Sequence, residues 1–416
     1  MAQTPLRLRL YGPHLEPDIR GIRWAFVLVG VADGTLLPYI PLYLLERGLN
    51  AAAIGAVLAG MAVVWLFAGL AWGHLADHHV SPERILVVGT AAAAVLALTL
   101  ALTADGAILA LLILVLTFVR SPLTLLDAVA LYKLRTMSRT GYARIRLRMS
   151  AGWALSAIAS GLVYQTFGLR LIPFFYAPLT AVVAIWIWRA VKPDATAISS
   201  ETAIPVGKGM RLGGIPLAMV GFLLSCLLLG VSLAATQNFV TLQISVLGGG
   251  ALLVASAAAF QALTEIPTMG YTHVLTRYLS HRALFALGCA IYLAVFIAWA
   301  LIDNALVVAL LKLVVGVAFA LTYVASVTIA NELSPPRLRA TGQALIKSTM
   351  FGLAPIIGAL GGGIVYGALG ARVMFLASTV VVAAAGAIAL AVVPVLRRTG
   401  EQPVVVSLEA AAPATP

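Results

Sequence analysis

Long apolar stretches alternate along the chain with short groups of charged, glycine and proline residues. Because a transmembrane helix needs about 20 consecutive, mostly apolar residues, this pattern predicts a protein that crosses a membrane many times. Twelve spans are expected, and most of the connections between them are short. They cover residues 22–45, 52–76, 84–103, 107–134, 146–167, 171–190, 214–238, 251–274, 282–302, 305–330, 341–366 and 372–395.

One long polar connection in the middle of the chain predicts a division into two six-helix bundles. The second bundle repeats features of the first, since Gly30-Val31 is matched by Gly230-Val231. Many secondary transporters are duplicated in this way, and their substrate site lies between the halves. The C-terminal tail is rich in proline and alanine and is expected to be disordered. The expected segments are a cytoplasmic arm, the first bundle, a cytoplasmic linker, the second bundle and a cytoplasmic tail: 1–21, 22–190, 191–213, 214–398 and 399–416.

The overall composition supports this reading. Of the 416 residues, 62% are hydrophobic and 10% are charged, whereas soluble domains are roughly 45–50% apolar and about 25% charged. Soluble enzymes, soluble nucleic-acid binders and disordered proteins are therefore excluded. Cys226 and Cys289 lie inside apolar runs, so neither a disulfide framework nor a paired-cysteine metal site is expected. Residues 1–20 lack an apolar core, so no cleaved signal peptide is expected.

The positions of the basic residues explain the net charge of +12. With the N-terminus in the cytoplasm, 21 of the 27 lysines and arginines fall in the N-terminal arm, the cytoplasmic loops and the tail. The outer loops hold three, namely Arg47, Arg170 and Arg372. This asymmetry predicts that both termini are cytoplasmic and that the chain spans the plasma or inner membrane. The basic charge therefore indicates orientation and contact with lipid headgroups, and no nucleic-acid partner is expected.

Two loops carry a recognisable pattern. The first is Gly73-His74-Leu75-Ala76-Asp77-His78-His79, followed by Arg84, and the second is Asn331-Glu332-Leu333-Ser334-Pro335-Pro336-Arg337-Leu338-Arg339-Ala340-Thr341-Gly342. Both resemble the signature loops of the major facilitator superfamily. The resemblance implies an all-α polytopic membrane protein with 12 transmembrane helices in two pseudo-symmetric six-helix bundles. It also implies a conformational role for this loop, in which Gly73 lets helices approach and Asp77 pairs with a base such as Arg84 or caps a helix end.

Shorter stretches resemble the lactose permease and phenylpropionate permease branch. They are Gly34-Thr35-Leu36-Leu37-Pro38-Tyr39-Ile40-Pro41, Tyr142-Ala143-Arg144-Ile145-Arg146-Leu147, Gly152-Trp153-Ala154-Leu155, Glu265-Ile266-Pro267 and Leu311-Lys312. The resemblance implies that Asp127 and Arg146 bind substrate hydroxyl groups and that Trp153 stacks against a ring. It also implies that Glu265 links binding to protonation. The branch's proton-coupling His/Glu pair is replaced by Val315 and Ala318, and Asp33 has no counterpart there.

Six ionisable residues lie deep in the expected spans: Asp33, Asp127, Glu265, Arg120, Lys312 and Lys347. Each costs about 2.5–3.5 kcal/mol even on a lenient insertion scale, so each needs a partner or a cavity. The balance of three acids and three bases predicts paired charges around one central cavity. Arg120 and Asp127 are seven residues apart and are expected to face the same side of their helix. For each residue, a purely structural pair that holds helices together is the alternative.

These considerations define the expected site. The substrate-binding residues are predicted to be Asp127, Arg146, Trp153, Lys312 and Arg120, and the proton-coupling residues Asp33 and Glu265. Desolvation disfavours a buried carboxylate and a nearby cation favours it, so moving a base between conformations can release or capture a proton. Tyr39, Tyr43 and Gln237-Asn238 are weaker candidates that equally suit interfacial anchors or interhelical bonds.

Other motifs favour structural interpretations. Gly-x-x-x-Gly pairs allow helix backbones to approach closely in lipid, and sliding contact during transport is the functional alternative. The pairs are Gly30/Gly34, Gly69/Gly73, Gly358/Gly362 and Gly363/Gly367. His74 and His78 are spaced like metal ligands on a helix, yet no thiol or further acid completes a shell, so no metal and no cofactor is expected. The glycine clusters lack the context of a phosphate loop.

The expected function is secondary active transport of a small organic solute by alternating access. Proton symport is favoured, with a sugar, a nucleoside or an aromatic acid as the solute. A proton-antiporting exporter of drugs or metabolites is the alternative. A membrane enzyme or a receptor would need a catalytic cluster or a large extramembrane domain, and a channel would not need the duplication. The expected partners are the solute, protons and the lipid bilayer, with the protein acting as a monomer.

Overall fold

The computed structural model describes residues 17–133, 139–191, 216–276, 278–335 and 338–394. The predicted linker after Val191, the tail from residue 399 and most of the N-terminal arm lie outside this part of the chain. Within it, the elements of secondary structure are all helices, and ten segments are long and apolar enough to cross a membrane. The all-helical, polytopic architecture expected from the apolar pattern is therefore confirmed.

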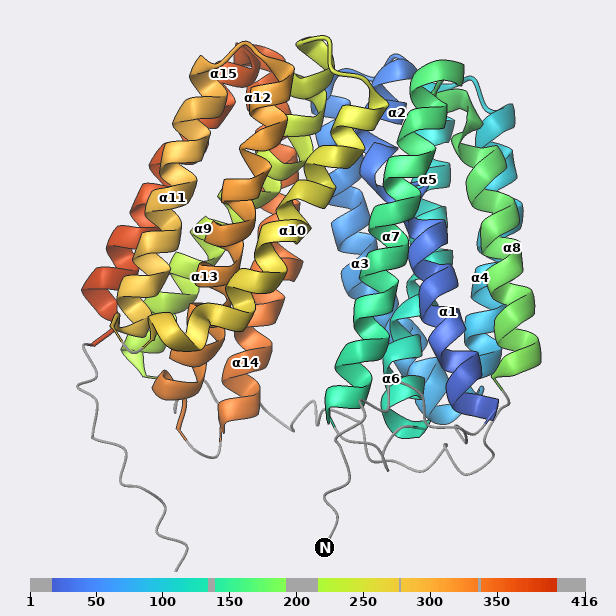
Figure 1. Cartoon of the computed structure of the whole chain (residues 1–416), viewed down its shortest axis with the longest axis horizontal. Coiled ribbons are helices and arrows are strands. Elements are labelled where there is room, and N and C mark those ends of the chain that lie inside the picture. Colours follow the sequence, from blue (N-terminus) through green and yellow to red (C-terminus); the bar gives the residue numbers. More distant parts are fainter. Residues whose placement is uncertain (1–16, 134–138, 192–215, 277, 336–337, 395–416) are drawn as a thin grey trace, which may run out of the picture.

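The elements follow the predicted spans in chain order (Figure 1). The first half contains α1 (Pro17–Gly34), η1 (Leu37–Tyr39), α2 (Ile40–Glu46), α3 (Ala51–His78), α4 (Pro82–Leu102), α5 (Gly106–Arg120), η2 (Ser121–Thr124), α6 (Leu125–Lys133), α7 (Arg139–Phe167), η3 (Leu169–Leu171) and α8 (Ile172–Ala190). The second half contains α9 (Leu217–Val246), α10 (Ala251–Leu275), α11 (His281–Leu301), α12 (Ala305–Leu310), α13 (Lys312–Leu333), α14 (Arg339–Ser348), the π-helical turn η6 (Thr349–Leu353) and α15 (Ala354–Val392).

The boundaries differ from the prediction in several places. α9 continues to Val246, eight residues past its predicted end, because the apolar residues there pack inside the protein. The predicted span 107–134 is divided by the 3₁₀ turn η2, which begins with Ser121 and Pro122. The last two predicted spans form one continuous helical stretch that is interrupted at Gly370, whose φ of 84° is non-helical. The count of twelve crossings stays a prediction beyond the ten segments above.

The two halves repeat the same construction. Glycines with a positive φ form the turns at Gly48 and Gly248, 200 positions apart, and at Gly168 and Gly370, 202 positions apart. A positive φ is readily adopted by glycine alone, so these turns require that residue. Chain order places all four at one end of the molecule, called here the glycine-turn end, opposite the end where α1 begins, called the α1 end.

Helix caps and helix contacts also recur. The side chains of Asp105 and Asn304 each accept hydrogen bonds from the backbone N–H groups that begin α5 and α12. A Cβ added at Gly30 would meet the carbonyl oxygen of Met149, and one added at Gly230 would meet that of Met350. The first half therefore packs α1 on α7 in the way that the second half packs α9 on the α14–α15 region.

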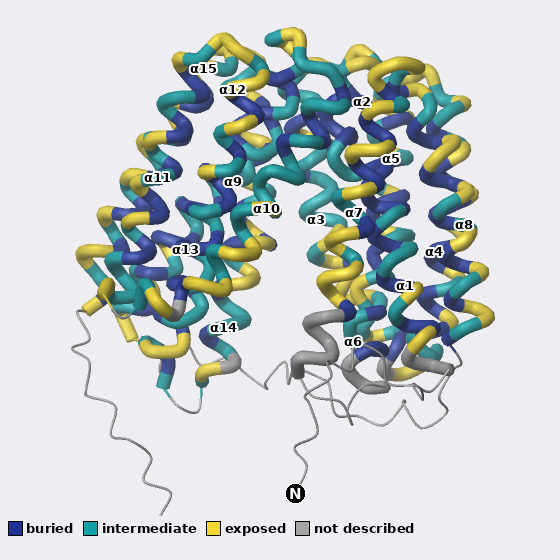
Figure 2. Tube along the Cα trace, in the orientation of Figure 1, coloured by how far each residue is buried: buried dark blue, intermediate teal, exposed yellow. Residues whose placement is uncertain are grey.

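The two bundles meet near the glycine-turn end and diverge toward the α1 end (Figures 1 and 2). The joining contacts are made by α3 against α15 and by α7 against α10. Gly55 and Gly363 face each other there so closely that a Cβ on either would overlap the other's backbone. Gly161 approaches the backbone of Ala251 and Leu252 in the same manner. Small residues therefore set the distance between the halves.

The Gly-x-x-x-Gly predictions are confirmed at three of the four pairs. Gly30/Gly34 pack on α7, Gly358/Gly362 on α9, and Gly363/Gly367 on α3. The prediction is wrong for Gly69/Gly73, because a Cβ at either position would have no neighbour within 4 Å. Gly73 therefore does not mediate a close helix approach in this conformation.

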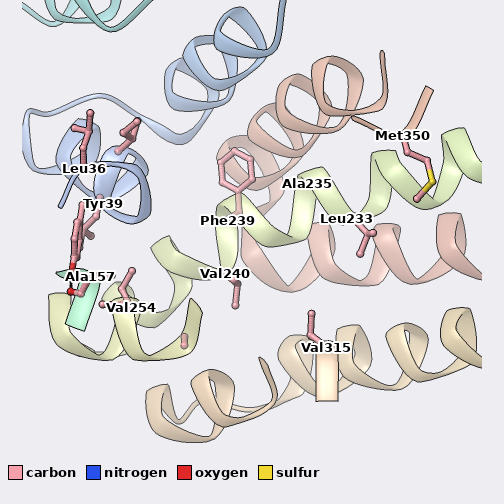
Figure 3. Close-up of a cluster of buried hydrophobic side chains, with 14 of the residues drawn as sticks. Leu36, Tyr39, Ala157, Leu233, Ala235, Phe239, Val240, Val254, Val315 and Met350 are labelled. Atoms are coloured by element: carbon pink, nitrogen blue, oxygen red, sulfur yellow. Dashed lines mark hydrogen bonds between the residues drawn. The ribbon is translucent and has the colours of Figure 1, made fainter. Parts of the chain in front are cut away.

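Buried aromatic residues complete the packing at the glycine-turn end. The Tyr39 hydroxyl donates to the backbone carbonyl of Ala157 on α7 (Figure 3). The Tyr39 ring meets that of Tyr164 edge to face, with 5.0 Å between centroids. The Tyr43 hydroxyl donates to the carbonyl oxygen of Leu100 on α4 at 3.2 Å. Both tyrosines therefore form interhelical hydrogen bonds, which was the predicted alternative to a contact with the solute.

A disulfide should lock the glycine-turn end. A Cβ at Gly367 would lie 3.7 Å from the Cβ of Ala52, within the range of about 3.5–4.5 Å found in disulfides. With Cys226 and Cys289 replaced by alanine, Ala52→Cys combined with Gly367→Cys is expected to cross-link under mild oxidation, as measured by thiol labelling and mass spectrometry. Ala52→Cys with Gly361→Cys is the control, since a Cβ at Gly361 has no neighbour within 4 Å. Equal cross-linking of both pairs would contradict the packing described.

Candidate functional site

A central cavity of about 290 Å³ lies between the halves, next to the joined glycine-turn end. Both halves contribute to its wall, which is mostly apolar. The lining residues are Leu37, Pro38, Ile40, Pro41, Leu58, Met61, Trp153, Gln237, Asn238, Val240, Thr241, Ile244, Val254, Ala257, Ala258 and Lys312. A pocket with apolar walls and a few convergent polar groups is the usual form of a small-molecule site, and this volume is at the low end of the usual range of about 300–1,000 Å³.

Lys312 provides the charge of this cavity. It is the first residue of α13, two positions after the short helix α12 ends, and the residue is 5% exposed. Its Nζ donates hydrogen bonds to Oε1 of Gln237 on α9 and to Oε1 of Gln261 on α10, the latter at 3.2 Å. The Trp299 ring on α11 lies with its centroid 6.0 Å from Nζ, the outer limit of a cation–π contact. Three helices thus hold the ammonium group in place.

The remaining polar groups of the cavity come from α7 and α9. Because Oε1 of Gln237 accepts from Lys312, the NH₂ group of this amide is left to donate. Asn238 donates through Nδ2 to the carbonyl of Ala234, which leaves its Oδ1 as an acceptor. Trp153, on α7, adds an indole ring to the wall. The predicted Trp153 and Lys312 are thus brought together from different halves.

A second cavity of about 240 Å³ lies within the first half and holds four of the predicted charges. Its wall includes Asp33, Arg120, Asp127 and Arg146, and it shares Leu37 with the central cavity. The expectation of one cavity for all six charges is therefore corrected, because three of them line this cavity and Lys312 lines the central one. The four charged side chains of this cavity come from α1, α5, α6 and α7 of the first half, whereas Lys312 comes from α13 of the second.

The strongest ion pair in this second cavity joins Asp33 and Arg120. Nη2 of Arg120 lies 2.6 Å from Oδ1 of Asp33, and their side chains are 15% and 7% exposed. Asp33 was predicted to bind and release the coupling proton. Arg120 was predicted to lie on the same helix face as Asp127. Both Arg120 and Asp127 do line this cavity, but the turn η2 separates them and the ion pair forms with α1 instead.

Asp127 and Arg146 form a looser pair. Nε of Arg146 lies 4.0 Å from Oδ1 of Asp127, and the two side chains are 47% and 40% exposed. Arg146 also contacts the sulfur of Met149 one turn along α7. The two residues linked by the sequence resemblance are therefore near each other, and both are accessible.

The remaining predicted charges lie elsewhere. Glu265 lies on α10 one turn after Gln261, and its carboxyl group is within hydrogen-bonding reach of that amide. Lys347 is exposed on α14, so its expected place among the deeply buried bases is wrong. Gln261 and Trp299 were not predicted, although the spacing of Gln261 and Glu265, four residues apart on one helix face, is a signal that the sequence does contain.

The predicted conformational loop lies at the α1 end. Gly73 is in the last turns of α3, and Arg84 is exposed near the start of α4. The side chain of Asp77 lies outside the described structure. The rings of His74 and His78 lie 4.4 Å apart, and Nδ1 of His78 contacts the carbonyl oxygen of His74 at 3.1 Å. Among the described residues, no group of three histidine, cysteine, aspartate or glutamate side chains is arranged to hold a metal.

Sequence comparison identifies the family. The model of the MFS_1 like family, a branch of the major facilitator superfamily, matches residues 25–377. The chain belongs to this family. No curated protein matches the sequence significantly. As a member of a transporter family, the protein is a multi-pass membrane transporter of small molecules and not an enzyme.

Solved structures share the fold of this MFS_1 like protein. The nucleoside transporter NupG matches with a TM-score of 0.78 at 18% identity, covering 90% of this chain and 98% of NupG. A bacterial homologue of the human lysosomal transporter Spinster, inward-facing and occupied, has a TM-score of 0.63 at 14% identity, covering 91% and 97%. A POT family transporter in complex with 5-aminolevulinic acid has a TM-score of 0.70 at 12% identity, covering 90% and 96%. These likenesses show the two-bundle fold.

Breaking the buried ion pair should destabilise the transporter more than breaking the exposed one. Asp33→Asn leaves Arg120 buried without its partner, which is expected to cost about 3–5 kcal/mol. Asp127→Asn should cost at most about 1 kcal/mol, because that pair is accessible to water. Thermal unfolding of the purified proteins in detergent measures both effects. The double variant Asp33→Asn/Arg120→Gln should recover much of the loss, and no recovery would contradict the pairing.

Proposed function

We propose that this MFS_1 like protein is a proton-coupled secondary active transporter that takes up a small polar organic solute by alternating access. The solute, a sugar, a nucleoside or an aromatic acid, binds in the central cavity between the halves. The observation that carries the proposal is the origin of the cavity wall, to which Trp153 comes from the first half and Gln237 and Lys312 from the second. A rocking motion of the halves would therefore open the same site to either side of the membrane.

The proposed orientation places the α1 end in the cytoplasm. The asymmetry of basic residues supports this, since Arg47, Arg170 and Arg372 are the three expected outside. In that orientation the halves are joined on the outer side and diverge toward the cytoplasm, which corresponds to an inward-facing state. The protein acts as a monomer in the plasma or inner membrane in this proposal, because each chain contains a complete central cavity.

The proposed solute contacts follow from the wall chemistry. Trp153 offers a ring face for stacking, while Lys312 and the Gln237 NH₂ group offer donors. Asp127 and Arg146 lie in the neighbouring cavity, where they would contact the solute along its path toward the α1 end. The NupG likeness in fold is compatible with a nucleoside among the candidate solutes.

Proton coupling is proposed to involve Asp33 and Glu265. Asp33 is held by Arg120, so any conformational change that separates the two would favour protonation of the carboxylate. Glu265 contacts Gln261, whose Oε1 accepts from Lys312, so a polar path joins this acid to the central cavity. A proton-antiporting exporter would use the same groups with the opposite direction of net solute flow, and remains the second candidate.

Solute exchange through the central cavity should depend on Trp153. Purified protein in liposomes is expected to catalyse counterflow of at least one member of a panel of sugars, nucleosides and aromatic acids, above protein-free liposomes. Trp153→Ala should raise the half-saturation concentration at least tenfold, whereas Trp153→Phe should preserve most of the affinity because it keeps a ring. Trp188→Ala is the matched control, since Trp188 is 68% exposed near the end of α8. Absence of counterflow for every solute would contradict the carrier function.

Gradient-driven uptake should depend on the two proposed coupling acids. Glu265→Gln and the charge-compensated Asp33→Asn/Arg120→Gln are each expected to lose accumulation driven by a pH gradient while retaining counterflow. The compensated double variant avoids leaving a buried guanidinium without a partner. Uptake measured with and without an imposed gradient separates the two activities. If both variants accumulate solute as the wild type does, neither acid couples transport to protons.

A further inference from the structure

The amino group of Lys312 differs from the guanidinium group of Arg120 in the kind of partner it has. Arg120 has the carboxylate of Asp33 at 2.6 Å. Lys312 is also buried, and its two acceptors are the neutral amide oxygens of Gln237 and Gln261. No described carboxylate lies within 4.0 Å of Nζ. The cavity therefore contains a buried amino group, and the described part of the chain supplies no counter-ion for its ammonium form.

The charged and titratable groups on the helices around Lys312 do not supply a counter-ion for its Nζ either. On α10, Glu265 contacts the Gln261 amide and not Nζ itself. On α11, the facing group is the Trp299 ring, and Tyr292 lies further along the helix, buried. α9 faces Nζ with the amide of Gln237. Across the cavity, α3 contributes apolar residues and α7 contributes Trp153, so no described acid lines the wall.

The energetic consequence is a site that is incomplete without an anion. A buried ammonium group without a counter-ion pays a desolvation cost of several kcal/mol, which two neutral acceptors offset in part. The ammonium form is therefore stabilised further only when an anion lies beside it. A carboxylate beside Nζ would supply the missing counter-charge, and it would find a second donor in the NH₂ group of Gln237.

Resting on the transport function proposed above, we infer that Lys312 binds a proton and the carboxylate of the solute together, so that the solute is a small organic monoanion carried with one proton. The neutral amine of the empty site takes up one proton to become an ammonium ion, which pairs with the carboxylate. On release the carboxylate departs and the amine returns its proton, so each cycle moves no net charge. The polar path through Gln261 and Glu265 provides the route for that proton.

The rest of the cavity defines the body of this anion. The wall beyond Lys312, Gln237, Asn238 and Thr241 is apolar apart from the indole of Trp153. A sugar presents hydroxyl groups all around its ring and would leave most of them facing carbon. A compact aromatic or aliphatic body with one carboxylate matches a wall that has its donors at one place.

The thermodynamic linkage between anion binding and proton binding allows a test without knowledge of the natural solute. Binding of the anion and binding of the proton strengthen each other by the same factor. Where the empty site holds the neutral amine, raising the pH by one unit should therefore weaken carboxylate binding about tenfold. The affinity of an uncharged ligand of the same shape should not follow this dependence.

The test uses full-length protein in lipid nanodiscs and matched ligand pairs. Calorimetric titration with benzoate, phenylacetate and butyrate, in two buffers that differ in ionisation enthalpy, counts the protons taken up on binding. We expect at least one of these carboxylates to bind with uptake of about one proton. Benzamide, phenylacetamide and butyramide should bind at least tenfold more weakly and without proton uptake.

Three variants separate the role of Lys312 from its contribution to folding. Lys312→Met should weaken carboxylate binding at least tenfold and abolish proton uptake. Lys312→Arg keeps a permanent charge, so carboxylate binding should persist while proton uptake and the pH dependence disappear. Lys347→Met removes the exposed lysine on α14 and should leave binding unchanged. The thermal unfolding temperature of each variant shows whether it is folded. The number of protons that the wild-type protein takes up on binding tests the inference without any variant.

The outcomes distinguish this inference from the transport proposal. Amides that bind as well as the acids, carboxylate binding without proton uptake, or a Lys312→Met variant that binds like the wild type would each overturn it. Counterflow of an uncharged solute with no carboxylate bound would also overturn it while leaving the carrier function intact. Carboxylate binding with proton uptake, but no counterflow of any solute, would contradict the carrier function instead.

Discussion

The close contact between Gly55 on α3 and Gly363 on α15 is the constraint on which the rest of the structure depends. Helices in a lipid bilayer gain little from the hydrophobic effect, so they associate where small residues let their backbones touch. In this transporter the touching residues between the halves cluster near the glycine-turn end, and the halves diverge elsewhere. The central cavity exists because the two bundles are joined on one side and separated on the other.

In the proposed rocking motion, the joint between the similarly built halves would act as the pivot. Gly48 and Gly248 make equivalent turns, and Met149 and Met350 make equivalent contacts with Gly30 and Gly230. The two halves are thus built from equivalent turns and equivalent helix contacts. The buried polar groups, in contrast, differ between the halves. The ion pair of Asp33 and Arg120 belongs to the first half, and the Lys312 cluster belongs to the second. These are the groups to which we assign a function.

The two charge clusters offset the free-energy cost of a buried charge in different ways. In the first half, a carboxylate and a guanidinium group compensate each other directly, which holds α1 against α5. In the second half, three helices position one ammonium group with neutral amides and an aromatic ring. A fully compensated pair is suited to structure and gating, whereas a partly compensated charge beside a cavity is suited to binding an external group.

The sequence by itself determined the class, the helices and their approximate limits, because apolar length and helix-breaking residues are local properties that act through the bilayer. It also identified the residues that carry charge in the spans, and it predicted the close packing of Gly358/Gly362 and Gly363/Gly367. The tertiary structure decided which charges meet. Asp33 pairs with Arg120 across 87 positions of sequence, Lys312 meets Gln261, and Lys347 is exposed. These partners depend on the rotation and register of helices that are distant in the chain, which residue spacing within one helix does not specify.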